Sequence, residues 1–188
     1  MREFNIYDFD KTIYNGDSTL NFYFFCLRKK ISLIFLFPIQ FLYFLLYKLR
    51  IIKKARFKEK FFIFLKYIKD IDYLVELFWK ENFKNIKEWF ITDKSVNKII
   101  ISASPEFLLL PLINKLNVID IIATKVDKFN GKFISKNCYG EEKVRRLNCK
   151  YKDYYINNFY SDSQSDIYIA KISKNSYLVK GNNIVKWL

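Results

Sequence analysis

The chain has 188 residues, enough for one domain or for one domain with a modest insertion. Hydrophobic residues make up 51% of it, and it has only four glycines and three prolines, which excludes disordered, collagen-like and linker-rich classes. A net charge of +14 suits an anionic partner, and the absence of histidine excludes serine–histidine and cysteine–histidine nucleophiles and the commonest zinc ligand.

The few cysteines and glycines exclude two further kinds of site. The three cysteines are odd in number and form no C-x-x-C pair, which argues against a disulfide framework or a zinc ribbon. The four glycines make neither a G-x-G-x-x-G fingerprint nor a phosphate loop, so we expect no nucleotide cradle. We expect a reducing cytoplasmic environment, since residues 1–10 also contain no apolar run of signal-peptide length.

The first predicted elements are a short strand over 3–7 and a long helical stretch over about 19–89. Asp17 followed by Ser18 is a helix-start signal for this stretch. The breaks expected in it are near Pro38, over 52–55 and over 69–72.

Basic charge is concentrated in the predicted helical stretch. Residues 21–69 hold twelve basic residues and one acid, so +11 of the net +14 lies there. The same segment contains an uncharged run from Ile31 to Tyr47, whose seventeen residues reach only about 25 Å as a helix, against roughly 30 Å of bilayer hydrocarbon. Basic residues flank this run on both sides, so we expect an interfacial or re-entrant membrane hairpin bent at Pro38. The alternative is a helical pair buried inside an insertion domain.

The second half of the chain alternates strands and helices. The predicted strands cover 98–101, 118–124, 154–160, 177–180 and 184–187, and the predicted helices cover about 106–116, 140–150 and 166–173, with a hairpin over 125–134 turned at Asn130-Gly131. The segment Ser104-Pro105-Glu106 is typical of a helix cap, first helical residue and dipole-compensating acid.

This order predicts an α/β fold with a doubly wound, mainly parallel sheet and an inserted helical cap. The catalytic core would comprise residues 1–18 and 96–188. The helical, basic and apolar cap would comprise residues 19–95.

Polar residues follow the predicted strands, where ligands bind in open α/β sheets. Asp8 and Asp10 follow the first strand, and Lys143 stands at the start of a helix, where its charge opposes the helix dipole. Two carboxylates two residues apart, with a third from a distant strand, make an oxygen-rich nest that suits magnesium. Without a cation their like charge would be costly. The remaining candidates in this set are Thr12, Ser102, Asp162 and Asp166.

Four segments in this order resemble the motifs of the haloacid dehalogenase superfamily of phosphatases, and in particular its phosphoserine-phosphatase-like branch. They are DFDKT at 8–12, IIISAS at 99–104, GEEK at 140–143 and YSDSQSD at 160–166. The resemblance implies a haloacid-dehalogenase-like Rossmannoid core. It does not extend to residues 19–95, where the superfamily places a variable cap. One departure is Lys11, where the superfamily often has glycine or serine.

The resemblance also implies roles for the individual residues. Asp8 would be the nucleophile that forms an aspartyl phosphate, and Asp10 the general acid and base. Ser102 and Lys143 would bind the phosphoryl oxygens. Magnesium would be held by Asp8, the Asp10 carbonyl, Asp162 and Asp166, and the substrate-binding residues would further include Thr12 and Asp17.

The leading functional prediction is a magnesium-dependent phosphomonoesterase acting on a membrane lipid phosphate at the inner face of an anionic membrane. A cap of this kind resembles that of bacterial phosphatidylglycerophosphate phosphatases. The alternatives are a soluble phosphatase for a small metabolite such as phosphoserine, and a catalytically silent membrane- or nucleic-acid-binding module. The intact set of Asp8, Asp10, Lys143 and Asp162 argues against the silent module, so we do not expect a nucleic-acid partner. An odd number of membrane crossings is excluded, because Asp8 precedes the insertion and the other site residues follow it.

Overall fold

The computed structural model describes all of residues 1–188 and is built on one six-stranded sheet with the strand order β3-β2-β1-β4-β5-β6. Strands β1 to β5 pair in parallel, and β6 pairs antiparallel with β5. The predicted doubly wound, mainly parallel α/β sheet is therefore confirmed. The strands are β1 (Arg2–Tyr7), β2 (Lys98–Pro105), β3 (Asp120–Thr124), β4 (Tyr154–Ser161), β5 (Ser173–Lys180) and β6 (Asn183–Lys186).

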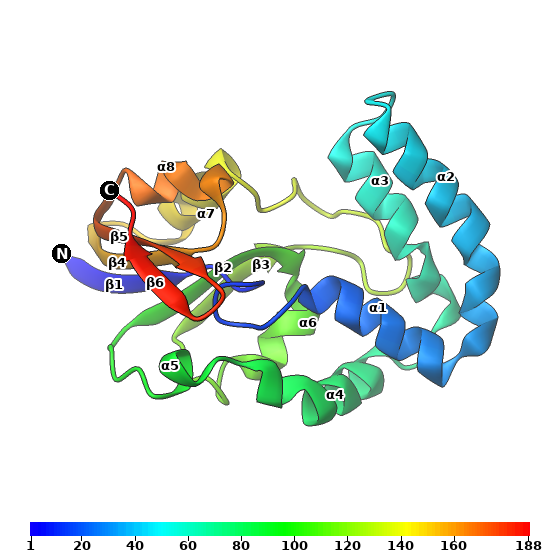
Figure 1. Ribbon diagram of the computed structural model, residues 1–188, viewed down its shortest axis with the longest axis horizontal. Helices are drawn as coiled ribbons and strands as arrows, with labels where there is room; N and C mark the ends of the chain where they lie inside the picture. Colours follow the sequence, from blue (N-terminus) through cyan, green and yellow to red (C-terminus); the bar gives the residue numbers. More distant parts are fainter.

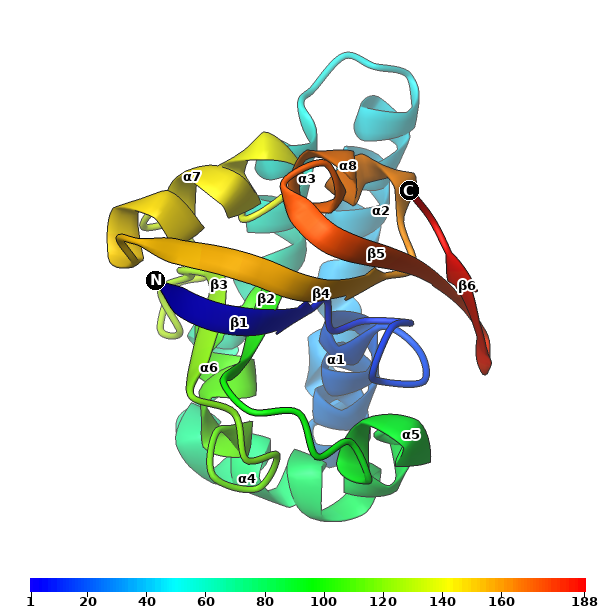
Figure 2. The same ribbon diagram turned by 90° about the vertical axis from the view of Figure 1, so that its left-hand side faces the viewer.

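Helices cover both faces of the sheet (Figure 1, Figure 2). Helices α7 (Glu141–Lys150) and α8 (Ile167–Ala170) lie on one face, with the 3-10 helix η5 (Gln164–Asp166) before α8, and α6 (Glu106–Leu109) lies on the other. Side chains of β2 alternate between the two layers: Ile99 and Ile101 belong to the hydrophobic cluster on the α7 side, and Ile100 belongs to the cluster on the α6 side. The strand is thus buried on both faces, as its continuous apolar run predicts.

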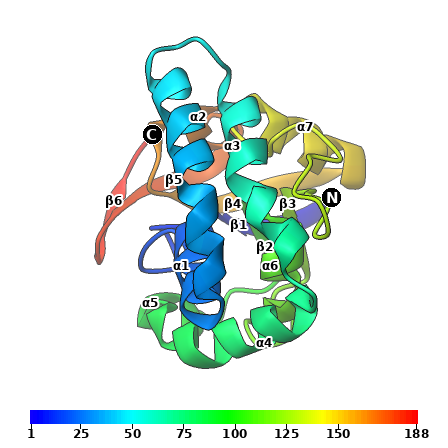
Figure 3. The ribbon, with the colours of Figure 1, turned by 90° about the vertical axis from the view of Figure 1, so that its right-hand side faces the viewer.

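The segment between β1 and β2 is helical throughout most of its length. Its elements are α1 (Ser18–Lys29), the 3-10 helix η1 (Ile31–Leu36), α2 (Phe37–Lys48), α3 (Lys54–Phe61), the 3-10 helix η2 (Phe62–Tyr67), α4 (Ile71–Asn82), the 3-10 helix η3 (Phe83–Asn85) and α5 (Glu88–Ile91). Helices α2 and α3 lie side by side and project beyond the sheet (Figure 1, Figure 3).

The predicted hairpin bend at Pro38 is wrong. Pro38 lies in the first turn of α2, where a proline is tolerated because that backbone N–H has no partner within the helix. The chain reverses instead over residues 49–53, between α2 and α3.

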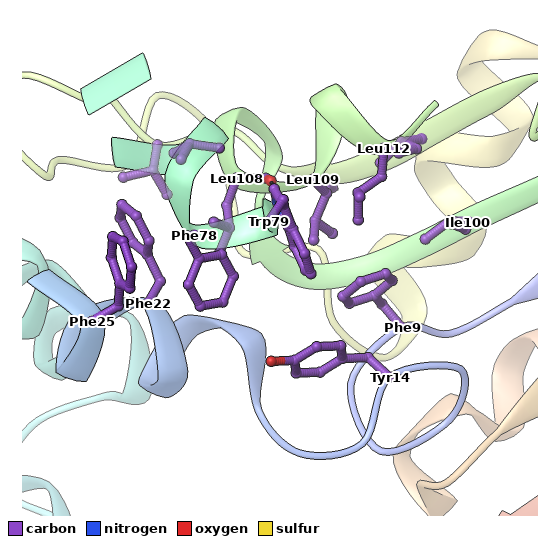
Figure 4. Close-up of a cluster of buried hydrophobic side chains, with 14 of the residues drawn as sticks. Phe9, Tyr14, Phe22, Phe25, Phe78, Trp79, Ile100, Leu108, Leu109 and Leu112 are labelled. Atoms are coloured by element: carbon purple, nitrogen blue, oxygen red, sulfur yellow. Dashed lines mark hydrogen bonds between the residues drawn. The ribbon is translucent and has the colours of Figure 1, made fainter. Parts of the chain in front are cut away.

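Helix α4 of the insertion packs directly on the sheet layer (Figure 4). The Trp79 indole Nε1 on α4 donates a hydrogen bond of 2.6 Å to the Leu108 carbonyl, and the Trp79 ring meets Phe9 edge-on at a centroid distance of 5.9 Å. One cluster of 27 buried residues therefore includes side chains from both parts. The division of the chain at residues 18/19 and 95/96 stays a prediction.

Two local predictions in the second half also differ from the structure. The helix expected over 106–116 is α6 followed only by the short 3-10 helix η4 (Leu110–Leu112), because Pro111 has no backbone N–H to continue the helical hydrogen bonds. Ser104 does not cap that helix, because β2 runs on to Pro105. The hairpin over 125–134 is reduced to one bridge, between Val126 and Phe133.

Candidate active site

The carboxyl ends of β1, β2 and β4 meet at one edge of the sheet, beneath the insertion. Asp8 follows β1, Ser102 lies near the end of β2, and Asp162 follows β4. The Asp8 amide donates a hydrogen bond of 2.8 Å to the Tyr160 carbonyl, which ties the ends of β1 and β4 together. The predicted residues that line a single cavity of 870 Å³ at this edge are Asp8, Asp10, Asp17, Ser102, Lys143, Asp162 and Asp166.

Lys143 joins two of the carboxylates. Its ammonium Nζ donates hydrogen bonds of 2.7 Å to Asp8 Oδ1 and of 2.7 Å to Asp166 Oδ2, and the residue is only 2% exposed. The Ser161 hydroxyl also donates to Asp166 Oδ2, at 2.7 Å. Burial lowers the pKa of Lys143, but the charges of Asp8 and Asp166 outweigh it and raise the pKa overall. The lysine that opposes the helix dipole is therefore a charged group inside the site.

Asp10 has only uncharged partners. The Ser18 amide donates a hydrogen bond of 2.7 Å to Asp10 Oδ1, and the Ser104 hydroxyl donates to Asp10 Oδ2. The Ser104 hydroxyl in turn lies 2.9 Å from the Thr19 hydroxyl. Burial, and then the charge of Asp17, raise the pKa of Asp10 to about 6, against the lowering effect of the two hydrogen bonds. Asp8 and Asp10 are thus two neighbouring carboxylates in different electrostatic environments.

Of the two further residues predicted to bind substrate, Thr12 and Asp17, only Asp17 lines the cavity. Thr12 is fully buried and does not line the cavity. Its hydroxyl donates to Asp8 Oδ2 at 3.3 Å and accepts from the Asp162 amide at 2.9 Å, so it connects the two strand ends. Asp17 caps α1 by accepting a 2.9 Å hydrogen bond from the Leu20 amide, and it also lines the cavity.

The acidic side chains suit a divalent cation. Asp8 and Asp166 share the Lys143 ammonium, and burial raises the pKa of both Asp8 and Asp162, with the charge of Asp166 adding to each rise. Asp166 Oδ1 is buried without a hydrogen-bond partner, which is a position that a cation or a donor would satisfy. No three acidic side chains form a ready cluster, since Lys143 stands between Asp8 and Asp166. The oxygen-only donor set fits a hard ion such as magnesium.

Lys58 of α3 reaches the site from the insertion, and sequence reasoning did not find it. The Lys58 ammonium donates hydrogen bonds of 3.1 Å to the Ala103 carbonyl, between Ser102 and Ser104, and of 3.2 Å to Asn137 Oδ1. Burial lowers the pKa of Lys58 to about 8. No local pattern marks this residue, because its partners lie far away in the chain.

Lys87 is a second lysine that the sequence does not mark. It is buried, and its ammonium donates hydrogen bonds of 2.8 Å to the Lys11 carbonyl and of 2.5 Å to the Gly181 carbonyl. Lys11 itself adopts φ of +59°, a left-handed conformation that glycine accepts more readily than lysine. The loop that carries Asp8 and Asp10 is thus fastened to the turn between β5 and β6.

Comparisons with known proteins agree with this architecture. A family model for haloacid dehalogenase-like hydrolases matches residues 6–171. No curated protein matches the sequence. One solved structure with this fold is a protein of unknown function from Bordetella pertussis Tohama I, with a TM-score of 0.78 and 17% identity over 94% of this chain and 89% of that one. A phosphoserine phosphohydrolase-like protein from Francisella tularensis subsp. tularensis SCHU S4 has a TM-score of 0.56 and 14% identity over 94% of this chain and 86% of that one. A phosphoserine phosphatase in its apo form has a TM-score of 0.51 and 14% identity over 94% of this chain and 85% of that one.

Proposed function

The chain belongs to the haloacid dehalogenase-like hydrolases, and from this premise we propose that it is a magnesium-dependent phosphomonoesterase that acts through an aspartyl phosphate. One observation carries the proposal: Asp8 and Asp10 face the same cavity with different partners. Burial raises the pKa of Asp8, and the Lys143 ammonium opposes that rise and so favours the ionised form of a nucleophile. Burial and the charge of Asp17 favour the protonated form of Asp10, as an acid needs, and they outweigh the hydrogen bonds from Ser18 and Ser104.

In the first half of the reaction, a carboxylate oxygen of Asp8 attacks phosphorus, and the bond from phosphorus to the ester oxygen breaks. Lys143 and the Ser102 hydroxyl hold the phosphoryl oxygens as their charge develops. Asp10 gives its proton to the departing alkoxide, so that an alcohol leaves. Ser18 and Ser104 hold the Asp10 carboxyl in place for this transfer.

In the second half, the Asp10 carboxylate takes a proton from a water molecule, whose oxygen attacks the phosphorus of the aspartyl phosphate. The bond between phosphorus and Asp8 breaks, which restores the Asp8 carboxylate and releases inorganic phosphate. Asp10 is then protonated again. A pKa of about 6 suits a group that must both give and take a proton near neutral pH.

Haloacid dehalogenase-like hydrolases typically use a divalent metal, and we propose magnesium. The groups that would hold it are the carboxylates of Asp8, Asp162 and Asp166 and the carbonyl of Asp10. When bound, magnesium offsets the negative charge shared by these acids and the phosphoryl group. Thr12 and Lys143 both donate hydrogen bonds to Asp8, and the Asp162 amide donates to Thr12, so these contacts hold Asp8 and Asp162 in position.

We further propose that the substrate is a lipid phosphate and that the protein binds an anionic membrane from the cytoplasmic side. The segment Ile31–Lys48 is a continuous apolar helical stretch of which only 11% is buried. The buried residue of α2 is the polar Gln40, whereas apolar residues of the same helix are exposed, such as Leu42, which is 51% exposed. This is the reverse of a helix in a water-soluble core, and it supports contact with lipid.

Basic residues at both ends of this segment support an anionic surface. Arg28 and Lys29 precede it, Lys48 is its last residue, and Arg50 and Lys53 follow it. Each such residue is worth roughly 1 kcal/mol at an anionic surface. We expect sedimentation with anionic vesicles that is stronger than with neutral vesicles and is partly reversed by salt. Replacing Lys48, Arg50 and Lys53 by glutamine should weaken sedimentation while hydrolysis of a small soluble phosphate persists. Wild-type protein that ignores anionic vesicles at low salt would contradict membrane binding.

A soluble phosphatase for a small metabolite is the second candidate, favoured by the likeness of the fold to phosphoserine-phosphatase-like proteins. The test is hydrolysis of phospholipid monophosphates beside soluble monophosphates such as phosphoserine, each with and without magnesium. Magnesium-dependent release of phosphate is the expected result, with the lipid preferred. Full activity after exhaustive chelation would contradict the metal requirement. No phosphate release from any ester would favour the silent binding module.

A further inference from the structure

The active-site cavity has two chemically different ends. At one end lie the carboxylates of Asp8 and Asp10 with Lys143. At the other, the lining is apolar and comes from the insertion. Its apolar residues on α1, η1, α2 and α3 are Leu20, Tyr23, Phe24, Leu27, Ile34, Phe37, Phe41, Phe44, Phe57 and Phe61.

The apolar lining follows helical spacing. On α2, Phe37, Phe41 and Phe44 are four and three residues apart, so they share one face of the helix. Adjacent pairs of these rings stack at centroid distances of 5.8 and 6.4 Å. Leu20, Phe24 and Leu27 repeat the same spacing on α1. The two faces turn towards a common space, yet they do not close on each other.

A polar contact holds α2 in place. The Tyr23 hydroxyl donates a hydrogen bond of 2.6 Å to Gln40 Oε1, and Gln40 Nε2 donates one of 2.9 Å to the Phe61 carbonyl. These bonds join α2 to α1 and to the end of α3, and the Phe44 ring also meets the Phe57 ring of α3 at a centroid distance of 5.9 Å. Phe41 remains 46% exposed within the cavity lining.

Two lysines stand beside the cavity without acidic partners. Lys58 donates only to neutral oxygens, and Lys54 lies 4.1 Å above the Tyr139 ring. Neither forms an ion pair, although both line the cavity. Lys58 is half-buried and Lys54 is exposed, and a half-buried cation without a counter-ion, such as Lys58, suits an anionic ligand that enters from outside.

We infer that the apolar part of the cavity binds one unbranched hydrocarbon chain of the substrate, so that this phosphatase selects long-chain phosphate monoesters within its own cap. The inference rests on the proposed phosphomonoesterase activity. The occupant needs phosphate at the Asp8 end and hydrocarbon along α1 and α2, because the cavity joins these surfaces without an intervening wall. Lys54 and Lys58 offer positive charge to the polar end of the ester, which carries the phosphate.

The test uses a series of soluble primary alkyl phosphates from ethyl to decyl, each at concentrations where it stays monomeric, with magnesium and without vesicles or detergent. Burial of each added methylene should raise kcat/KM by about two- to fourfold, until the groove is full. A flat profile from ethyl to decyl would overturn the chain site. Failure to hydrolyse any member, ethyl phosphate included, would instead count against the phosphomonoesterase activity itself, and so the two failures are distinguishable.

Adjacent residues of α2 provide a matched pair of variants. Phe41 lines the cavity and is 46% exposed, whereas Leu42 does not line it and is 51% exposed. Phe41→Gln should lower the ratio of decyl to ethyl phosphate kcat/KM about tenfold or more. Leu42→Gln should keep the wild-type ratio. Equal effects of the two variants in solution would overturn the inference, and would leave α2 as a membrane contact alone.

Discussion

We predict that replacing Lys58, a partly buried charge without a carboxylate partner, raises the free energy of unfolding at neutral pH and lowers activity. Lys58→Met removes an ammonium that donates to the Ala103 carbonyl and Asn137 but has no carboxylate partner. Methionine keeps the length of the side chain and needs no solvation. The substitution therefore separates the cost of burying the charge from the space that the side chain fills.

The magnitude follows from the pKa of Lys58, which burial lowers from 10.5 to about 8. At about 1.4 kcal/mol per pKa unit, the charged form costs up to roughly 3 kcal/mol in the folded state. The side chain is only half-buried, and the variant loses two hydrogen bonds, which reduces the expected gain to about 1 kcal/mol or more at pH 7. In wild type the unfolded state binds more protons between the two pKa values, so wild-type stability rises there with pH.

Urea unfolding of both proteins between pH 7 and pH 10.5 measures this difference. The variant should be more stable at pH 7, and its advantage should shrink by roughly 1 to 3 kcal/mol between pH 8 and 10.5, where Lys58 loses its proton in wild type. The variant should also hydrolyse decyl phosphate with a higher KM. A difference in stability that does not change with pH would refute the reasoning about the buried charge.

Three further predictions concern the backbone around the site. Lys11→Gly should raise the thermal midpoint slightly or leave it unchanged, because φ of +59° costs lysine about 1 to 2 kcal/mol, which the entropy of glycine partly offsets; a clear loss of stability would contradict this. Gly131→Ala should lower the free energy of unfolding, measured in urea, by about 1 kcal/mol or more, since its Cβ would meet the Phe62 carbonyl oxygen at 2.4 Å and φ is +75°; unchanged stability would mean that the loop moves freely. Lys87→Met should lower kcat more than it raises KM, because the carbonyls of Lys11 and Gly181 lose the donor that fastens the loop carrying Asp8 and Asp10; a normal kcat would separate this lysine from the catalytic loop.

The sequence predicts the sheet and most of the site because both depend on local signals at strand ends. Asp8, Ser102 and Asp162 each follow or end an apolar segment, and parallel strands bring their carboxyl ends to the same edge. Lys143 is recognisable because it lies in the first turn of a helix, where a positive charge opposes the helix dipole and so indicates a role outside the helix. Correct assignment of the strands and of the helix start is therefore sufficient to predict that these residues lie close together.

The remaining features depend on contacts between distant segments. Ser104 has the sequence of a helix cap, but β2 continues through it and its hydroxyl bonds Asp10 instead, so a tertiary contact overrides a local preference. Lys58 and Lys87 carry no local signal, because their partners lie 45 to 94 positions away in the chain. Likewise, hydropathy marks Ile31 to Tyr47 as apolar but does not tell that the chain reverses after this run rather than at Pro38.

Trapping the phosphorylated enzyme tests the central claim most directly. Wild type and three variants, Asp8→Asn, Asp10→Asn and Leu42→Gln, would be mixed with a phosphate monoester and magnesium, quenched in acid and digested for mass spectrometry. We predict one added phosphoryl group on the peptide that contains Asp8 in wild type and Leu42→Gln, and none in Asp8→Asn. Asp10→Asn should slow both the departure of the alcohol and the attack of water, so its turnover should fall by about 10² to 10⁴. Turnover without any phosphorylated peptide, or near-normal activity in folded Asp8→Asn, would contradict the account.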